Sequence, residues 1–200
     1  MKQLSIQPLI NYFETYLPFD NVEKQLLEGR ISTYQVSRRQ TILQAGLVCR
    51  HYTFVVEGCF RMFAVDQKGI EHNVQFTAEN DWIADIGSFH SGQPSQLFIE
   101  SIEPSVILQI EQQDLYFLYT NILKLDRIFK VIIENKYIEL QDRVLQTISS
   151  TAQERYLAFL ERYAGLAQRL PNLQIASYLG ITPEFLSKIR KDLATNHSHS

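Results

Sequence analysis

Apolar positions change their spacing twice along the chain, and each spacing predicts a different kind of structure. In residues 4–17 they recur every three or four positions, which is typical of an amphipathic helix, and Pro18 ends the run. Asp20 is a suitable N-cap for a second short helix that ends at Gly29. The first thirty residues are therefore predicted to be helical.

From about residue 31 to residue 110 the spacing becomes two, and the segments are short and rich in β-branched and aromatic residues. Gly, Pro, Asp and Glu clusters separate them. The predicted strands are 31–36, 40–43, 52–56, 60–65, 70–76, 97–102 and 106–110. Seven short strands with no long helix between them favour an antiparallel β-roll or jelly roll.

After Gln112 the helical spacing returns, with a short helix at 115–119 and a long helix at about 122–148. A helix of that length spans roughly 40 Å. Its apolar residues form two stripes, which either both pack on the same domain or divide between that domain and a second copy. We favour the second interpretation, a dimerisation helix. Its predicted contact residues are Leu125, Phe129, Ile132, Ile133, Tyr137, Leu140 and Val144.

The helical pattern is interrupted at residues 149–151, where a short hinge is predicted. Thr151 and Glu154 have the spacing of a capping box, in which each side chain bonds the other residue's backbone N–H. The predicted division is a β-roll at 1–120, a dimerisation helix at 121–149 and a small all-α domain at 150–200. The fold class is therefore α+β.

Residues 173–189 have the pattern of a helix-turn-helix. Gly180 ends the first helix, Thr182 caps the second, and Pro183 occupies its first position. Phe185, Leu186, Ile189 and Leu193 are expected to be its buried side. The predicted DNA-binding residues are Thr182, Glu184, Ser187, Lys188, Arg190 and Lys191.

Within that set, Glu184 and Lys188 suit base edges, whereas Arg190 and Lys191 suit the phosphate backbone. The structural alternative is a three-helix packing module whose charged face only meets solvent. We favour DNA binding because the pattern is continuous over seventeen residues and the local charge is positive.

Charge is distributed unevenly over the 200 residues, whose net charge is −3. Residues 1–149 carry −5 and residues 150–200 carry +2, so the basic part coincides with the predicted helix-turn-helix. No apolar run is long enough for a membrane span, and the first residues lack a signal-peptide pattern. With only two cysteines, a disulfide framework is excluded and a cytoplasmic location is expected.

The chain resembles the Crp/Fnr family of bacterial transcription regulators. The resemblance rests on QTILQAG at 40–46, YTFVVEG at 52–58 and AQER at 152–155, and it extends over nearly the whole chain. It implies a cyclic-nucleotide-binding-like β-roll, a homodimer, binding of double-stranded DNA and contact with RNA polymerase, with no membrane partner. The family usually continues into a two-stranded wing after its recognition helix. Here residues 193–200 predict that the helix-turn-helix domain lacks a wing.

The effector site departs from the pattern of cyclic-nucleotide binders. Ala84 and Asp85 stand where those proteins carry Gly-Glu, and Ser95 and Gln96 stand where they carry Arg followed by Ser or Thr. Loss of the Arg forfeits a charge-assisted contact worth about 1.5–3 kcal/mol. Cyclic AMP is therefore disfavoured, and the effector is an unknown small molecule or signal. The predicted pocket comprises Ile83, Ala84, Asp85, Ile86, Ser95, Gln96 and Asn135.

Three alternatives are weighed against these assignments. Asp85 is about as well explained as a carboxylate that caps local amides. His51, His72 and His90 are too dispersed for the ligand set of a metal-dependent jelly-roll enzyme, so neither an enzyme nor a metal or cofactor site is predicted. A signalling module of the same fold with weak or lost DNA binding is the remaining alternative.

Overall fold

The computed structural model describes residues 5–197, with side chains through Thr195. The chain divides into two units. The first contains the residues up to Ala64 together with Gln75–Lys136, and the second contains Val65–Val74 together with the residues from Tyr137 onward. Each unit is described by itself below.

Two short helices begin the first unit: α1 (Gln7–Glu14) and α2 (Asn21–Glu28). The Asp20 carboxylate accepts a hydrogen bond from the Glu23 backbone N–H, and the Glu23 side chain accepts one from the Asp20 N–H. The predicted N-cap is therefore confirmed, and the capping box adds a reciprocal bond. Leu4, the first residue of the predicted pattern, lies outside the described residues.

Eight strands form two four-stranded sheets. They are β1 (Ser32–Val36), β2 (Thr41–Leu43), β3 (His51–Glu57), β4 (Phe60–Val65), β5 (Glu71–Thr77), β6 (Asp81–Ile83), β7 (Phe98–Ser101) and β8 (Ser105–Glu111). One sheet has the order β1-β8-β3-β6 and the other β2-β7-β4-β5, and the registers of the described pairs are antiparallel. The seven predicted strands are all present. Strand β6 and the helix α3 (Ile86–Ser91) were not predicted.

Strand β3 shows how the first unit builds its core, because its side chains alternate between two faces. Tyr52 and Phe54 pack against Trp82 at ring-centroid distances of 5.1 Å, and Phe129 lies 5.2 Å from the same indole. Thr53, between the two rings, points to the other face of the sheet and pairs with Gln109 of β8. One face of this sheet is thus an aromatic core, and the other combines the polar pair Thr53 and Gln109 with the buried pair Val55 and Ile107.

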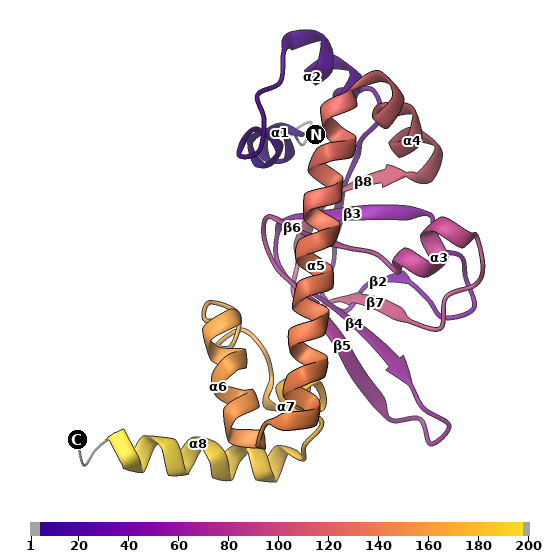
Figure 1. Ribbon diagram of the computed structural model, residues 1–200. Coiled ribbons are helices and arrows are strands. Elements are labelled where there is room, and N and C mark those ends of the chain that lie inside the picture. The colour runs from indigo at the N-terminus through magenta and orange to yellow at the C-terminus, as the bar shows by residue number, and fades with distance from the viewer. Residues whose placement is uncertain (1–4, 198–200) are drawn as a thin grey trace. The chain divides into compact units, whose positions relative to one another are not determined.

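Helix α4 (Gln112–Asn121) follows β8 and is longer than predicted. Ile122 leaves the helical region at φ −129°, and α5 (Leu123–Ser149) then runs for 27 residues (Figure 1). The N-terminal part of α5 is held to α2 by an ion pair of 2.7 Å between Lys124 and Glu23. The long helix predicted at 122–148 is therefore confirmed to within one residue at each end.

The second unit contains the connection between β4 and β5, the end of α5, and three further helices (Figure 1). These are α6 (Ala152–Arg162), α7 (Asn172–Leu179) and α8 (Pro183–His197). Thr151 and Glu154 form the predicted capping box at the start of α6. The sequence predicts no wing after the recognition helix. Within the described residues no strand follows α8, and α8 itself continues to His197.

Candidate functional site

Helices α7 and α8 are joined by the tight turn that the sequence predicts. Gly180 adopts φ +66°, a left-handed conformation that strains any residue with a Cβ, and the Ile181 N–H returns to the Ala176 carbonyl at 3.0 Å. Thr182 caps α8, because its hydroxyl accepts a hydrogen bond of 3.2 Å from the Phe185 N–H. The turn chemistry therefore fixes how α8 leaves α7.

The outer face of α8 carries most of the polar residues assigned to DNA binding. Leu186 and Ile189 are buried on the inner side of the helix. The exposed residues of the predicted set are Thr182, Glu184, Ser187, Lys188 and Lys191. One face of α8 thus presents a carboxylate, two hydroxyls and two ammonium groups to solvent.

Arg190 does not belong to that exposed set. It is half-buried, and its Nε donates a hydrogen bond of 2.8 Å to the Tyr156 hydroxyl while its Nη1 donates to the Asn172 side chain. The guanidinium therefore ties α8 to α6 and α7. In the sequence, Arg190 is one basic residue in a basic run. Its partner Tyr156 lies in α6, 34 positions away, so the local sequence does not indicate this contact.

Phe185 was expected in the core but is 45% exposed. It lies in the first turn of α8, next to Glu184, so its ring joins the exposed surface. Its position three residues before Lys188 places it at the edge of the apolar stripe, where helical spacing alone does not decide between inside and outside. The expected buried position of Phe185 is wrong.

Helix α7 is held by the first residues of β5, a feature that the sequence analysis missed. The Asn73 backbone N–H donates to the Ser177 hydroxyl at 3.1 Å, and the Asn73 amide donates to the Gln174 carbonyl at 3.0 Å. The Ser177 hydroxyl in turn donates to the Glu71 carbonyl at 2.9 Å. No local pattern signals these bonds, because more than 100 positions separate the partners.

The apolar residues of α5 fall into a buried group and an exposed group. Leu125, Phe129 and Ile132 lie in the core of the first unit, so they are unavailable to a partner and their assignment to a dimer contact is corrected. Ile133 is half-buried against the same core. The exposed apolar residues of α5 within the second unit are Tyr137, Ile138, Leu140, Val144, Leu145 and Ile148. The residues of the predicted contact that are exposed, Tyr137, Leu140 and Val144, thus all lie in the C-terminal half of the helix.

The predicted effector residues have different structural environments. Asp85 is the N-cap of α3 and accepts a hydrogen bond of 3.1 Å from the Ser88 N–H. Its second oxygen accepts one of 2.6 Å from the Ser95 hydroxyl, and Ser95 is buried. The carboxylate therefore has the capping role that the sequence left open, and it joins the two ends of the α3 segment.

The other five predicted effector residues are divided between the core and the surface. Ile83 and Ala84 are buried, whereas Ile86, Gln96 and Asn135 are exposed. Trp82 of β6 and Phe89 of α3 pack against Tyr52 at 5.1 and 5.7 Å. Aromatic rings thus occupy the core beside the predicted site.

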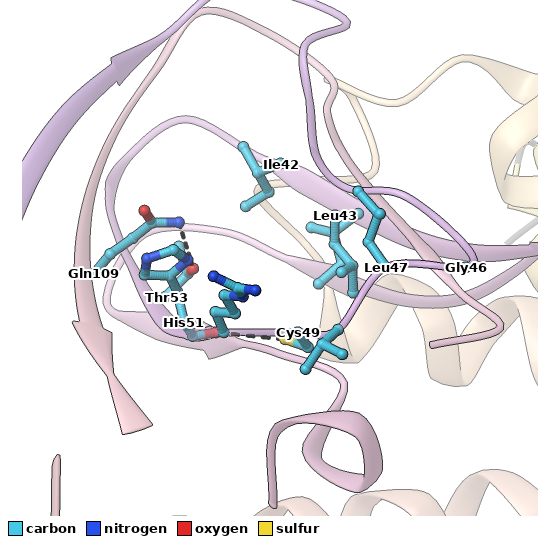
Figure 2. A pocket seen from close by; sticks show the side chains of 11 residues that line it. Ile42, Leu43, Gly46, Leu47, Cys49, His51, Thr53 and Gln109 are labelled. Carbon is cyan, nitrogen blue, oxygen red and sulfur yellow. Dashed lines mark hydrogen bonds between the residues drawn. The ribbon is translucent and has the colours of Figure 1, made fainter. Parts of the chain in front are cut away.

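A cavity of about 510 Å³ lies in the first unit and includes none of the predicted effector residues. Figure 2 shows Thr53, His51 and Gln109 on one side of it and Ile42, Leu43 and Leu47 on the other. The complete lining is Ile42, Leu43, Gly46, Leu47, Val48, Cys49, Arg50, His51, Thr53, Ile99 and Gln109. Its volume is within the range of small-molecule pockets.

The polar groups of this cavity have distinct environments. The Gln109 amide donates a hydrogen bond of 3.1 Å to the Thr53 hydroxyl. Burial lowers the pKa of His51, so its imidazole favours the neutral form. Burial raises the pKa of the Cys49 thiol, which donates to the His51 carbonyl at 3.5 Å. A neutral thiol in this setting is a poor nucleophile.

The remaining histidines are engaged locally. His72 lies 3.0 Å from the Asp66 carboxylate, and that contact lowers the pKa of Asp66. His90 lies 3.0 Å from the Tyr116 hydroxyl. Among the residues that the structure describes, no three His, Cys, Asp or Glu side chains form a group that could hold a metal ion. None of the described helices is long and apolar enough to cross a membrane.

These features define the class of the fold: an antiparallel β-roll followed by a long helix and C-terminal helices. Residues 33–121 match the family model of the cyclic nucleotide-binding domain. The match covers the strands of the roll from β1 onward and ends with α4. This stretch is therefore similar in fold to a cyclic nucleotide-binding domain, and the similarity says nothing about a bound nucleotide.

Solved structures with the same architecture include transcription regulators. FixK2 from Bradyrhizobium japonicum is 18% identical with a TM-score of 0.73, covering 84% of this chain and 86% of that chain. The c-di-GMP responsive regulator CLP from Xanthomonas campestris is 13% identical with a TM-score of 0.70, covering 89% and 93%. A protein described as a Crp/Fnr-family transcriptional regulator, from Eubacterium rectale, is 14% identical with a TM-score of 0.71, covering 93% and 88%. Comparison with curated proteins finds no match.

Proposed function

We propose that this protein is a homodimeric, DNA-binding transcription regulator of the Crp/Fnr type. The observation that carries the proposal is the exposed face of α8, which follows a tight turn after α7 in a chain with the fold of such regulators. In a helix-turn-helix, the second helix enters the major groove and its first residues contact base edges. The function is therefore assigned to α8, with the fold as support.

Within α8, each exposed residue has a chemistry that suits one part of DNA. Lys188 can donate to guanine O6 and N7, and Glu184 can accept from the cytosine amino group. Phe185 offers an apolar surface that suits the methyl group of thymine. Lys191 suits a phosphate, whereas Arg190 positions α8 through Tyr156.

The exposed half of α5 supports the homodimer. Its apolar residues lie on one side of the helix, and this arrangement is typical of a helix that pairs with a second copy. Two α8 helices in such a dimer would contact half-sites about 34 Å apart on a pseudo-palindromic operator. Such a regulator acts in the cytoplasm, with RNA polymerase as its further partner.

The roll is the part that would respond to a signal. A ligand that binds one arrangement of the chain better than another shifts the population toward it, and thus changes how the two α8 helices are presented. Cyclic AMP is disfavoured as that ligand, because Ser95 and Gln96 provide no guanidinium for its phosphate. Asp85 is also committed to Ser88 and Ser95.

The test is a gel-shift titration against fragments of a bacterial genome, with Lys188→Ala and Lys191→Ala measured separately. Lys188→Ala should cost about 1–3 kcal/mol at the preferred site and relax its sequence preference. Lys191→Ala should weaken binding to all sequences and reduce the salt dependence by about one phosphate contact per chain.

The matched control is Lys130→Ala, which removes an exposed lysine of α5 that belongs to the first unit. It should leave DNA binding unchanged. Wild-type protein that binds no fragment would favour an interaction module that has lost DNA binding. Binding that survives both α8 substitutions unchanged would overturn the assignment of α8.

A further inference from the structure

The cavity bounded by β2, the 44–50 loop and β3 is separate from the surfaces used in the proposed function. It includes neither the predicted effector residues nor any residue of α5 or α8. Strand β3 turns His51 and Thr53 toward it, while Tyr52 and Phe54 face the aromatic core. The cavity thus lies on the face of the sheet β1-β8-β3-β6 that is opposite the aromatic core.

The polar side of this cavity includes the Thr53 hydroxyl and the Gln109 amide (Figure 2). Thr53 is only 2% exposed, and its hydroxyl accepts from Gln109. Within residues 5–197 that hydroxyl has no acceptor for its own proton, and the second N–H of the Gln109 amide has none either. A ligand group that accepts hydrogen bonds would satisfy both donors.

Arg50 adds a positive charge to the same lining. Across the part of the chain that the structure describes, its guanidinium forms no ion pair and no hydrogen bond. Arg30 and Arg61, in the same unit, pair with Asp114 at 2.7 Å and with Glu100 at 2.9 Å. Arg50 is therefore the cation in this cavity that is available to an anion, and guanidinium pairs well with carboxylates.

The wall of the cavity opposite these polar groups indicates the chemistry of the rest of the ligand. It is made of aliphatic side chains, chiefly Ile42, Leu43, Leu47, Val48 and Ile99. Such a wall favours a ligand with a hydrocarbon body, because contact with the aliphatic side chains removes the ligand's apolar surface from water. A nucleotide, whose base and ribose carry many polar groups, would leave those groups unpaired there.

We propose that this cavity binds a small monocarboxylic acid with a hydrocarbon body. The carboxylate contacts Arg50 and accepts from the Thr53 hydroxyl and the Gln109 amide, and the hydrocarbon lies along Leu43 and Ile99. The role of such an acid as the regulatory signal rests on the proposed function, whereas its binding does not.

The test is isothermal titration calorimetry of the full chain with octanoate, and with 1-octanol as the uncharged counterpart. Octanoate is expected to bind at one site per chain and more tightly than octanol. Arg50→Gln should weaken octanoate binding by about tenfold, the cost of one charge-assisted contact, and change octanol binding by less than about twofold. Thr53→Val, which keeps the shape of the buried side chain, should also weaken octanoate binding.

Arg38→Gln is the matched control, since it removes an exposed arginine that does not line this cavity. The proposal is overturned if octanoate does not bind, or if Arg50→Gln and Arg38→Gln have the same effect on its affinity. The titration contains no DNA, so a failure of DNA binding leaves its result intact. A gel shift repeated with octanoate then shows separately whether the acid acts as the signal.

Discussion

The two halves of α5 have similar apolar spacing but opposite environments. In the N-terminal half, Leu125 is fully buried in the first unit, together with Phe129 and Ile132. In the C-terminal half, Ile148 is 79% exposed, and Leu140 and Val144 are also exposed. Large apolar side chains gathered on one exposed face mark an interaction surface. The comparison therefore separates a helix segment that stabilises its own domain from one whose exposed face suits a partner.

The difference also shows what an apolar stripe means. Periodicity predicts that the apolar face of a helix will be buried, but it does not say whether the residues that provide this burial belong to the same chain. In the first half the aromatic core provides it, with Phe129 beside Trp82 and Tyr52. In the second half we assign it to a second copy of the chain. The four predictions below test this contrast in order of expected effect.

The largest effect is expected in the buried half. Phe129→Ala leaves a cavity beside Trp82 and Tyr52, and should lower the free energy of unfolding by about 3–5 kcal/mol. Urea denaturation monitored by tryptophan fluorescence measures the change, because Trp82 is the one tryptophan of the sequence. A loss below about 1 kcal/mol would contradict the placement of Phe129 in the core.

In the exposed half, the same kind of damage should affect assembly and not folding. Leu140→Asp combined with Val144→Asp places two like charges on the apolar face, and should convert a dimer into a monomer that remains folded. Light scattering after size exclusion measures the mass. Val22→Asp, at an exposed valine of α2, is the control and should leave the mass unchanged. A double variant that stays dimeric would remove this face from the interface.

The junction after the exposed half should give a smaller effect. Thr151→Ala removes the side-chain cap of α6 and should cost about 1 kcal/mol of stability. Hydrogen bonds from Thr151 lower the pKa of Glu154, so the stabilisation is present above the ordinary Glu range and is lost as pH falls through the folded-state pKa. The difference in stability between the wild type and Thr151→Ala should therefore shrink in acid but not vanish, because the bond from the Glu154 N–H to the Thr151 hydroxyl does not depend on pH. Thr151→Ser, which keeps the hydroxyl, should retain most of the stability.

The smallest effect is a pH dependence that belongs to the first unit. Burial lowers the pKa of His51, so the unfolded chain takes up this proton at a higher pH than the folded chain does. Stability should fall as pH drops from the ordinary His value, about 6.5, toward the lower folded-state pKa. Nearby Glu111 opposes the shift and Arg50 adds to it. His51→Gln should flatten this part of a denaturation profile, and a profile that remains unchanged would be inconsistent with it.

Much of the fold could be predicted because its local signals are strong. The caps at Asp20, Thr151 and Thr182 and the left-handed Gly180 each follow from residue type and spacing, and all are present. Strand β6 has only three residues, Asp81–Ile83, and α3 only six, so each spans less than two periods of its hydrophobic pattern. Periodicity loses its power at such lengths.

The site was less predictable because its decisive contacts are not local. Arg190 forms a hydrogen bond with Tyr156, which lies 34 positions away in the sequence, and Asn73 forms one with Ser177, which lies 104 positions away. The cavity at Arg50 and Thr53 forms only when β2, β3, β7 and β8 come together, so no linear motif marks it. Residue type indicated what chemistry each side chain offers, but the fold decides which groups meet.

Selection of bound sequences from a random pool of double-stranded DNA tests the central claim most directly. If the exposed half of α5 joins two chains and each α8 contacts one half-site, the selected sequences should contain an inverted repeat. Its half-site centres should lie about 10 base pairs apart, or a multiple of that spacing, as one turn of B-DNA requires. A pool with no enriched sequence, or with a single unrepeated half-site, would contradict the account.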